Sequence, residues 1–181
     1  IDEVFEYSPK NPISLYAITK NEMEKIAEDF FYRGFDISII RFSTVFGGMN
    51  DHPTRVIPLF IRLALNNRPL TIIGHTKLVF PTYVAAVSEC VKNFSLHENT
   101  GIVEKMVIRN FIANGILLID LARLIIKLCN SKSEIIILNK DTNYANSILR
   151  TDFPNELLFG WEKFLDLYIR NINFADKRNR D

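Results

Sequence analysis

The sequence predicts an α/β fold with a largely parallel sheet, and two observations carry this prediction. Helical stretches with one apolar face alternate with short apolar runs along the chain, which is the order expected when helices connect parallel strands. Nearly half of the 181 residues are hydrophobic, so the chain can bury a real core. This length suits one domain, or one domain with a small appendage.

The first helix is expected between Ser14, a suitable N-cap residue, and Gly34, a suitable C-terminal stop. Residues 1–11 before it are polar and turn-like. Tyr16 and Lys20 are four residues apart in this helix, so both side chains leave the same face, one turn apart. The apolar spacing predicts that this face is the buried stripe, where an unpaired lysine would be costly.

An ammonium group beside a phenol favours the phenolate form. Tyr16 with Lys20 is therefore a candidate acid/base pair that can take a proton from an alcohol or return one to a ketone. Spacing alone does not decide, because a Tyr-x-x-x-Lys pattern arises by chance in about one in three chains of this composition. The competing interpretation is that Tyr16 and Lys20 are ordinary packing residues of an unrelated α/β domain.

A strand at residues 36–42 leads into a loop of small residues, Ser43 to Gly48. Such a loop is typical of the ligand edge of an open α/β sheet, although an ordinary exit from a strand gives the same pattern. Further along the chain, helical periodicity and apolar runs predict the remaining elements. These are helices at 55–66, 84–94, 118–129 and 161–172, strands at 70–73, 105–108 and 134–138, an extended segment at 77–83, and a loop at 140–155. The strand at 134–138 is expected to be buried.

Composition narrows the class of protein. The 22 Lys and Arg residues nearly balance the 21 Asp and Glu residues, which argues against a dedicated nucleic-acid binder. Charged residues interrupt the most apolar region, residues 111–129, so we expect an amphipathic helix there and no membrane span. Cys90 and Cys129 are interpreted as buried thiols of a cytoplasmic protein, and the scattered histidines predict no metal site.

Four motifs follow one another in a fixed order: NPISLYAITK at 11–20, RFSTVFG at 41–47, RVIPLFI at 55–61 and RPLTIIG at 68–74. This order resembles the extended short-chain dehydrogenase/reductase group, the NAD-dependent epimerase/dehydratase family that acts on nucleotide sugars. The resemblance runs from about Pro12 to Val84. It continues weakly to the segment LFGW at 158–161.

The resemblance implies a role for each matching residue. Tyr16 would be the catalytic acid/base on a sugar hydroxyl, and Lys20 would stabilise its phenolate and hydrogen-bond the nicotinamide ribose, so that both also contact the cofactor. Ser43 would touch the nicotinamide end of the cofactor, and Thr44 would contact the substrate. The pair Arg55–Val56 would meet the diphosphate and the nucleotide of that substrate.

The resemblance also implies a fold and a reaction. The chain would hold the C-terminal part of a Rossmann-like doubly wound parallel sheet plus a small mixed substrate-binding portion. It would form a single partial domain, with the end of the NAD-binding part at residues 1–50 and mainly the substrate-binding part at residues 51–181. The implied reaction is transient oxidation of a nucleotide-diphosphate sugar by NAD, with NADP as the alternative cofactor, in a homodimer.

Several departures from the family pattern set a second hypothesis beside the first. The glycine-rich dinucleotide turn is absent from the sequence, and Ala85 and Ala86 stand where the family usually has acids. The chain starts at Ile1, so we expect a fragment of such an enzyme. A catalytically inactive remnant that acts as a binding or structural module is the alternative. The sequence leaves open the sugar, the cofactor phosphate, and the choice between epimerisation, dehydration, decarboxylation and reduction.

Overall fold

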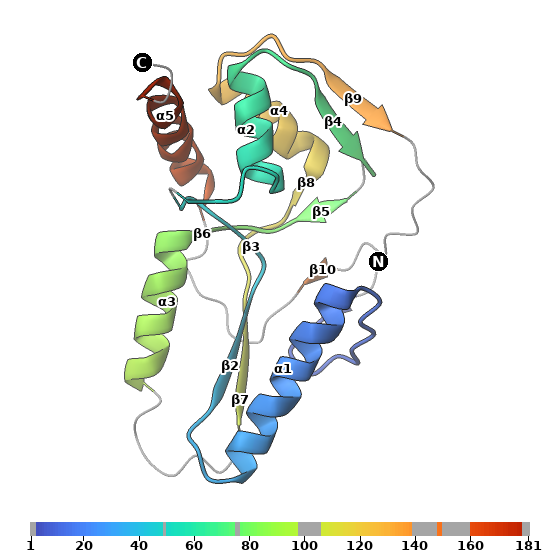
Figure 1. The fold of residues 1–181 in the computed structure, drawn as a ribbon, viewed down its shortest axis with the longest axis vertical. Helices are drawn as coiled ribbons and strands as arrows, with labels where there is room; N and C mark the ends of the chain where they lie inside the picture. Colours follow the sequence, from blue (N-terminus) through green and yellow to red (C-terminus); the bar gives the residue numbers. More distant parts are fainter. Residues whose placement is uncertain are drawn as a thin grey trace.

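The computed structural model describes residues 3–48, 50–74, 77–97, 106–138, 148–149 and 160–178. Helices and strands alternate along these residues, as the sequence predicts (Figure 1). The helices are α1 (Leu15–Tyr32), α2 (Val56–Leu65), α3 (Val84–His97), α4 (Leu118–Leu128) and α5 (Glu162–Arg178). The strands are β1 (Glu3–Val4), β2 (Ser38–Phe42), β3 (Thr44–Phe46), β4 (Leu70–Ile73), β5 (Leu78–Val79), β6 (Pro81–Tyr83), β7 (Val107–Phe111), β8 (Ile116–Leu117), β9 (Ile135–Leu138) and β10 (Ile148–Leu149).

Most strand pairs are parallel, which confirms the predicted fold class. β2 pairs with β7, β3 with β6, β4 with β9 and β1 with β10 in parallel, whereas β5 and β8 are antiparallel. Figure 1 shows β2 and β7 between α1 on one side and α3 on the other, which is the layering of a doubly wound sheet. β2 continues directly into β3, so the end of this sheet leads to the second part of the molecule.

The second part holds the main hydrophobic core, at the top of Figure 1, where α2, α4 and α5 lie together. α2 is strongly amphipathic and turns one face inward. The residues of α2 that are buried are Ile57, Pro58, Phe60, Ile61 and Ala64. Trp161 at the start of α5 is buried too, and its indole Nε1 donates a hydrogen bond to the Asn114 carbonyl at 3.2 Å.

Local signals place α1 as predicted, but its burial differs from the prediction. The Ser14 hydroxyl accepts from the amide of Ala17 at 3.1 Å, and Gly34 ends the helix with a φ of +90°. No residue of α1 is buried, and Tyr16 is 72% exposed. The expected buried stripe is therefore wrong for these residues. Among the described elements, β2 lies on one side of the helix (Figure 1), and its Arg41 hydrogen-bonds across to Glu24.

Further expectations are corrected by the structure or lie outside the described residues. β9 was expected to be buried, yet its residues 136–138 are exposed, because pairing with β4 satisfies backbone groups without covering the side chains on the faces of the strand. β7 begins later than expected, at Val107. The predicted loop at 140–155, apart from the two residues of β10, lies outside the described residues, as do the first two letters of the LFGW segment.

Cys90 and Cys129 are not joined in a disulfide bond. Cys90 is buried and Cys129 is half-buried at the end of α4, where burial raises the pKa of its thiol to about 11. The predicted burial is thus confirmed for Cys90 and only in part for Cys129, and both side chains pack in or against the hydrophobic core. None of the helices within the described part of the chain combines the length and the apolar composition that crossing a bilayer requires.

Candidate active site

Tyr16 and Lys20 lie in the first two turns of α1 and come together as their spacing predicts. The Lys20 ammonium lies 5.7 Å from the centroid of the Tyr16 ring and 3.9 Å from the sulfur of Met23. Both side chains are exposed, so a ligand can reach the phenol and the ammonium at once. The geometry places a cation over the face of the phenol ring, and the predicted acid/base role of the pair stays a prediction.

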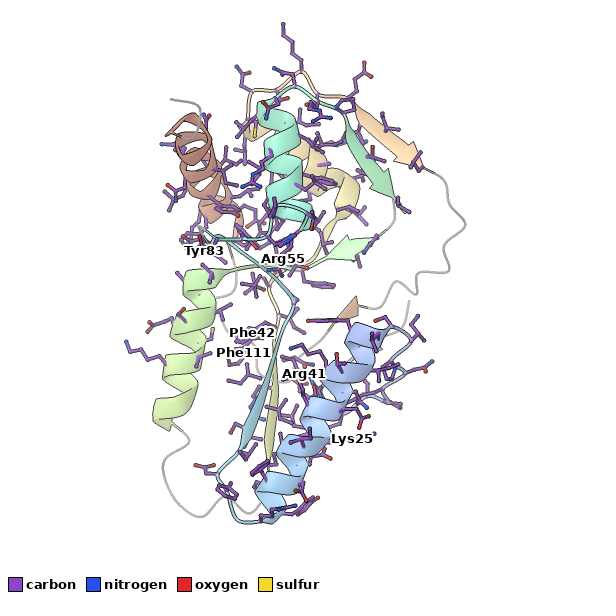
Figure 2. All side chains as sticks on the ribbon, viewed as in Figure 1. Lys25, Arg41, Phe42, Arg55, Tyr83 and Phe111 are labelled. Carbon is purple, nitrogen blue, oxygen red and sulfur yellow. The ribbon has the colours of Figure 1, made fainter. Side chains whose placement is uncertain are left out.

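One turn further along the same face, Glu24 takes part in a network that the sequence reasoning missed. Arg41 of β2 donates from Nε to Glu24 Oε1 at 2.8 Å and from Nη2 to Glu24 Oε2 at 2.7 Å. Its Nη1 also donates to the Glu6 carbonyl at 2.7 Å, and the Lys10 ammonium pairs with Glu24. Figure 2 labels Arg41 between β2 and α1. The signal that could have found Glu24 is its position four residues after Lys20.

These hydrogen bonds set the charge states of the network. The hydrogen bonds from Arg41 hold the pKa of Glu24 below its ordinary value, and Lys10 acts in the same direction. Reciprocally, the hydrogen bonds to Glu24 raise the pKa of Arg41. The ion pair is bidentate and mostly shielded from water, since the two side chains are 18% and 24% exposed. It therefore ties α1 to β2 at a defined position.

Ser43 and Thr44 lie where β2 passes into β3, and both are bonded to the start of β6. The Ser43 hydroxyl donates to the Phe80 carbonyl and lies 3.2 Å from the hydroxyl of the buried Thr82. The backbone amide of Thr44 donates to the same carbonyl at 3.1 Å. Their positions are thus fixed by the strand crossover, and their predicted contacts with cofactor and substrate stay predictions.

The glycine at the end of the motif after β3 is required by its surroundings. Gly47 has a φ of +108°, and a Cβ atom there would lie 2.4 Å from the ring of Tyr83. That ring in turn stacks on Phe164 of α5 at a centroid distance of 4.4 Å, with the planes 4° apart. The loop therefore lies close against the aromatic cluster of Tyr83 and Phe164. This close contact fixes the path of the chain from β3 toward α2.

Arg55 and Val56 stand at the N-terminal end of α2 (Figure 2 labels Arg55). Arg55 is exposed, and its Nη1 lies 3.2 Å from Asp51 Oδ1. Tyr168 of α5 donates from its hydroxyl to the other carboxylate oxygen of Asp51 at 3.3 Å, and burial raises the pKa of this phenol. Val56 packs partly against the core. A cation thus stands at a helix N-terminus, a position suited to an anionic group.

The structure brings the predicted residues together in pairs that come from three different elements. Tyr16 and Lys20 come from α1, Ser43 and Thr44 from the junction of β2 with β3, and Arg55 and Val56 from the start of α2. In Figure 1 the N-terminal end of α1, the end of β2 and the start of α2 all lie toward the middle of the molecule. The carboxyl end of a parallel strand such as β2 is where open α/β sheets bind ligands.

Residues 1–81 match the model of the NAD dependent epimerase/dehydratase family, a stretch that contains every predicted site residue. A search of curated proteins found no match to this chain. Among solved structures, a UDP-glucose 4-epimerase from Thermotoga maritima, solved with UDP-glucose, superimposes with a TM-score of 0.76 at 19% identity. The overlap covers 97% of this chain and 58% of that protein.

Two Bacillus enzymes give similar results. A dTDP-glucose 4,6-dehydratase from Bacillus anthracis, solved with NAD, has a TM-score of 0.76 at 18% identity, over 98% of this chain and 58% of its own. A UDP-glucuronic acid 4-epimerase from Bacillus cereus, solved with its nucleotide sugar and NAD, has a TM-score of 0.77 at 20% identity, over 97% and 57%.

At these identities the likeness establishes the fold, and the chain spans less than three fifths of the length of each of these three enzymes. The match to the family model covers the motif of the first helix and the three motifs after it. The resemblance to the NAD-dependent epimerase/dehydratase family is therefore confirmed over residues 1–81, and the Rossmann-like fold of solved epimerases and dehydratases extends along nearly the whole chain.

Proposed function

We propose that this chain carries the tyrosine helix and the substrate-binding part of a nucleotide-sugar epimerase or dehydratase. Residues 1–50 would form the end of the NAD-binding part, and residues 51–181 mainly the substrate-binding part. The observation that carries the proposal is the Lys20 ammonium at 5.7 Å from the Tyr16 ring, within the segment that matches the family model. Tyr16 would act as the acid/base and Lys20 as its electrostatic partner.

The residues present fit the nicotinamide end of NAD. The exposed Lys20 ammonium can donate to a ribose hydroxyl while it faces the Tyr16 ring. The Ser43 hydroxyl gives its hydrogen to the Phe80 carbonyl, which leaves an oxygen lone pair to accept from the nicotinamide amide. When bound, NAD supplies acceptance and later return of a hydride. Tyr16 takes the proton of the sugar hydroxyl as the hydride leaves and gives it back afterwards.

A nucleotide-diphosphate sugar is the proposed substrate class. The solved relatives include enzymes of UDP-glucose, UDP-glucuronic acid and dTDP-glucose, and they share the fold of this chain. Arg55 at the N-terminal end of α2 offers an exposed guanidinium to a diphosphate, and Asp51 steadies it at 3.2 Å. Val56 would contact the nucleotide beside it, and Thr44 would contact the sugar.

The homodimer is proposed on the same footing. One side of α1 carries large apolar side chains that are exposed within the described structure. A second copy covering this side would bury them, and each buried side chain of this size stabilises an association by about 1.5 to 3 kcal/mol. Sedimentation of the protein would show the dimer. The residues concerned are Leu15, Met23, Ile26 and Phe30.

A catalytically inactive remnant with a binding or structural role is the second candidate. It is favoured by Ala85 and Ala86 at the start of α3, where the first turn contains no acidic residue although the family usually has acids. This departure affects a predicted ligand contact more than it affects the fold.

Activity of the whole protein separates the two candidates. We expect the whole protein to bind NAD and to convert a nucleotide sugar. The Tyr16→Phe variant should keep NAD binding and lose turnover by about 10²- to 10⁴-fold, because the acid/base is gone. Tyr32→Phe, a change of the exposed tyrosine at the far end of the same helix, is the matched control and should retain activity. Absence of NAD binding, or full activity of Tyr16→Phe, would support the remnant.

A further inference from the structure

One face of α1 carries a phenol, an ammonium group and a carboxylate on successive turns. Tyr16, Lys20 and Glu24 are spaced by four, so their side chains leave successive turns about 6 Å apart along the axis. Opposite charges four residues apart on a helix attract each other. Lys20 therefore has two neighbours that compete for its ammonium, the phenol one turn before it and the carboxylate one turn after it.

In the structure the competition is decided in favour of the phenol. Glu24 is held by three protein contacts, the two hydrogen bonds from Arg41 at 2.8 and 2.7 Å and the ion pair with Lys10. The Lys20 ammonium instead lies beside the Tyr16 ring. Arg41 comes from β2 and Lys10 from the segment before α1, so two elements outside the helix supply the cations that occupy the carboxylate.

Further charged groups surround the arginine and hold it in this position. Its third bond goes to the Glu6 carbonyl at 2.7 Å, and the charges of Glu6 and Tyr7 act on it together with that of Glu24. A guanidinium can bond a carboxylate with two parallel N–H groups and still offer a third, which a lysine cannot do. The identity of residue 41 as arginine is therefore part of the arrangement.

We propose that Arg41 is a positioning residue for the acid/base pair: by holding Glu24 in a bidentate ion pair it keeps this carboxylate away from Lys20, so that the Lys20 ammonium stays with Tyr16. This inference rests on the proposed function for its turnover readout, whereas the ionisation of Tyr16 is measurable without turnover. Without Arg41, the Glu24 carboxylate draws Lys20 one turn down the helix. Lys20, whose positive charge favours a phenolate beside it, then acts on Tyr16 from further away.

The test compares three variants of the whole protein by the pH profile of kcat/KM. Arg41→Met removes both arginine hydrogen bonds and leaves Lys10 alone on the Glu24 carboxylate, so this carboxylate can attract Lys20 and the acidic limb of the profile should move to higher pH by about one unit. Glu24→Gln removes the carboxylate itself, so its limb should stay at the wild-type position. The double variant Arg41→Met/Glu24→Gln has nothing to attract Lys20 away, so its limb should return to the wild-type position. A merely structural ion pair would make the two single variants alike.

Ultraviolet titration of tyrosinate gives the second readout. The signal of Tyr16 is the difference between each variant and the same variant carrying Tyr16→Phe, and it should move with the acidic limb. Arg41→Lys keeps the charge without the two-pronged bond, so it should give a smaller shift of the same sign, and it replaces Arg41→Met if that variant does not fold. Asp29→Asn removes the exposed Asp29–Arg33 ion pair of the same helix and is the control.

The outcomes separate this inference from the proposed function. If the Tyr16 titration shifts in Arg41→Met and returns to its wild-type position in the double variant, the inference is supported, whether or not turnover is detected. No movement with Arg41→Met, or equal movement with Glu24→Gln, overturns it even in an active enzyme. A whole protein without NAD binding or turnover would overturn the proposed function alone.

Discussion

The cluster of α2, α4 and α5 and the unit of α1, β2 and β7 are both built from amphipathic elements, yet they bury their residues very differently. α2 buries five of its residues, whereas α1 buries none over a longer stretch of helix. The helices of the cluster pack against one another through apolar side chains, and Leu121 and Ile125 of α4 are fully buried. α1 is instead fixed to β2 by the ion pair between Glu24 and Arg41.

The difference shows how stability and function are distributed in this chain. The helix cluster gains its stability from area removed from water, about 25 cal/mol per Å². The α1 unit relies on a few directional contacts, and it leaves the candidate acid/base pair and an apolar side open to ligands and partners. A well-packed apolar part thus lies beside a part with exposed side chains. In the proposed function, a ligand and a second copy of the chain would cover these side chains.

The largest expected difference in stability is between removing a buried and an exposed apolar side chain, one from each part. Ile61→Ala in α2 should lower the free energy of unfolding by about 2 to 5 kcal/mol, because Ile61 is fully buried and the change leaves a cavity. Ile26→Ala in α1, the same chemical change at a position that is 58% exposed, should alter it by about 0.5 kcal/mol or less. Urea denaturation of this chain measures both.

An equal cost for Ile61→Ala and Ile26→Ala would break the comparison. It would mean that something covers α1 in solution, as the proposed second copy would. Repeating the Ile26→Ala measurement at several protein concentrations distinguishes the cases, because coverage by a second copy makes the cost depend on concentration.

A smaller effect is expected where the loop after β3 enters the aromatic cluster. Gly47→Ala should cost about 1 to 3 kcal/mol, because the residue has a φ of +108° and its new Cβ would meet the Tyr83 ring. Gly48→Ala is the matched control, since no atom lies within 4 Å of a Cβ placed there, and it should leave stability nearly unchanged. Thermal unfolding compares the two, and similar midpoints would show that the Tyr83–Phe164 stack does not hold the loop.

Local chemistry made much of this structure predictable. The hydroxyl of Ser14 and the positive φ of Gly34 bound α1 where the sequence indicated, and four-residue spacing brought Tyr16 and Lys20 together. Cap residues and helical periodicity act within a few residues, so a single sequence contains them in full. The order of motifs added the family resemblance, which the match over residues 1–81 confirms.

What escaped prediction depends on distant partners. Periodicity says which side chains of α1 share a face, but it does not say whether another element covers that face, so the exposure of Tyr16 was missed. The exposure of Ile136 in β9 was missed for the same reason. The pairing of Glu24 with Arg41 joins residues 17 apart, from a helix and a strand. No local pattern specifies such a contact, and it forms only when the chain folds.

The smallest expected effect is the contribution of the Glu24–Arg41 ion pair to stability, which depends on pH. Arg41 holds the pKa of Glu24 below its ordinary value of about 4.3, so its contribution is complete above that pH and is lost as the pH falls through the lower folded value. Glu24→Gln should therefore cost about 1 to 2 kcal/mol at neutral pH and progressively less in acid. Asp29→Asn, which breaks an exposed pair on the same helix, should cost about 0.5 kcal/mol or less throughout. Chemical denaturation at several pH values measures both, and a Glu24→Gln cost that persists unchanged in strong acid would mean that packing of the Glu24 side chain, and not its charge, connects α1 to β2.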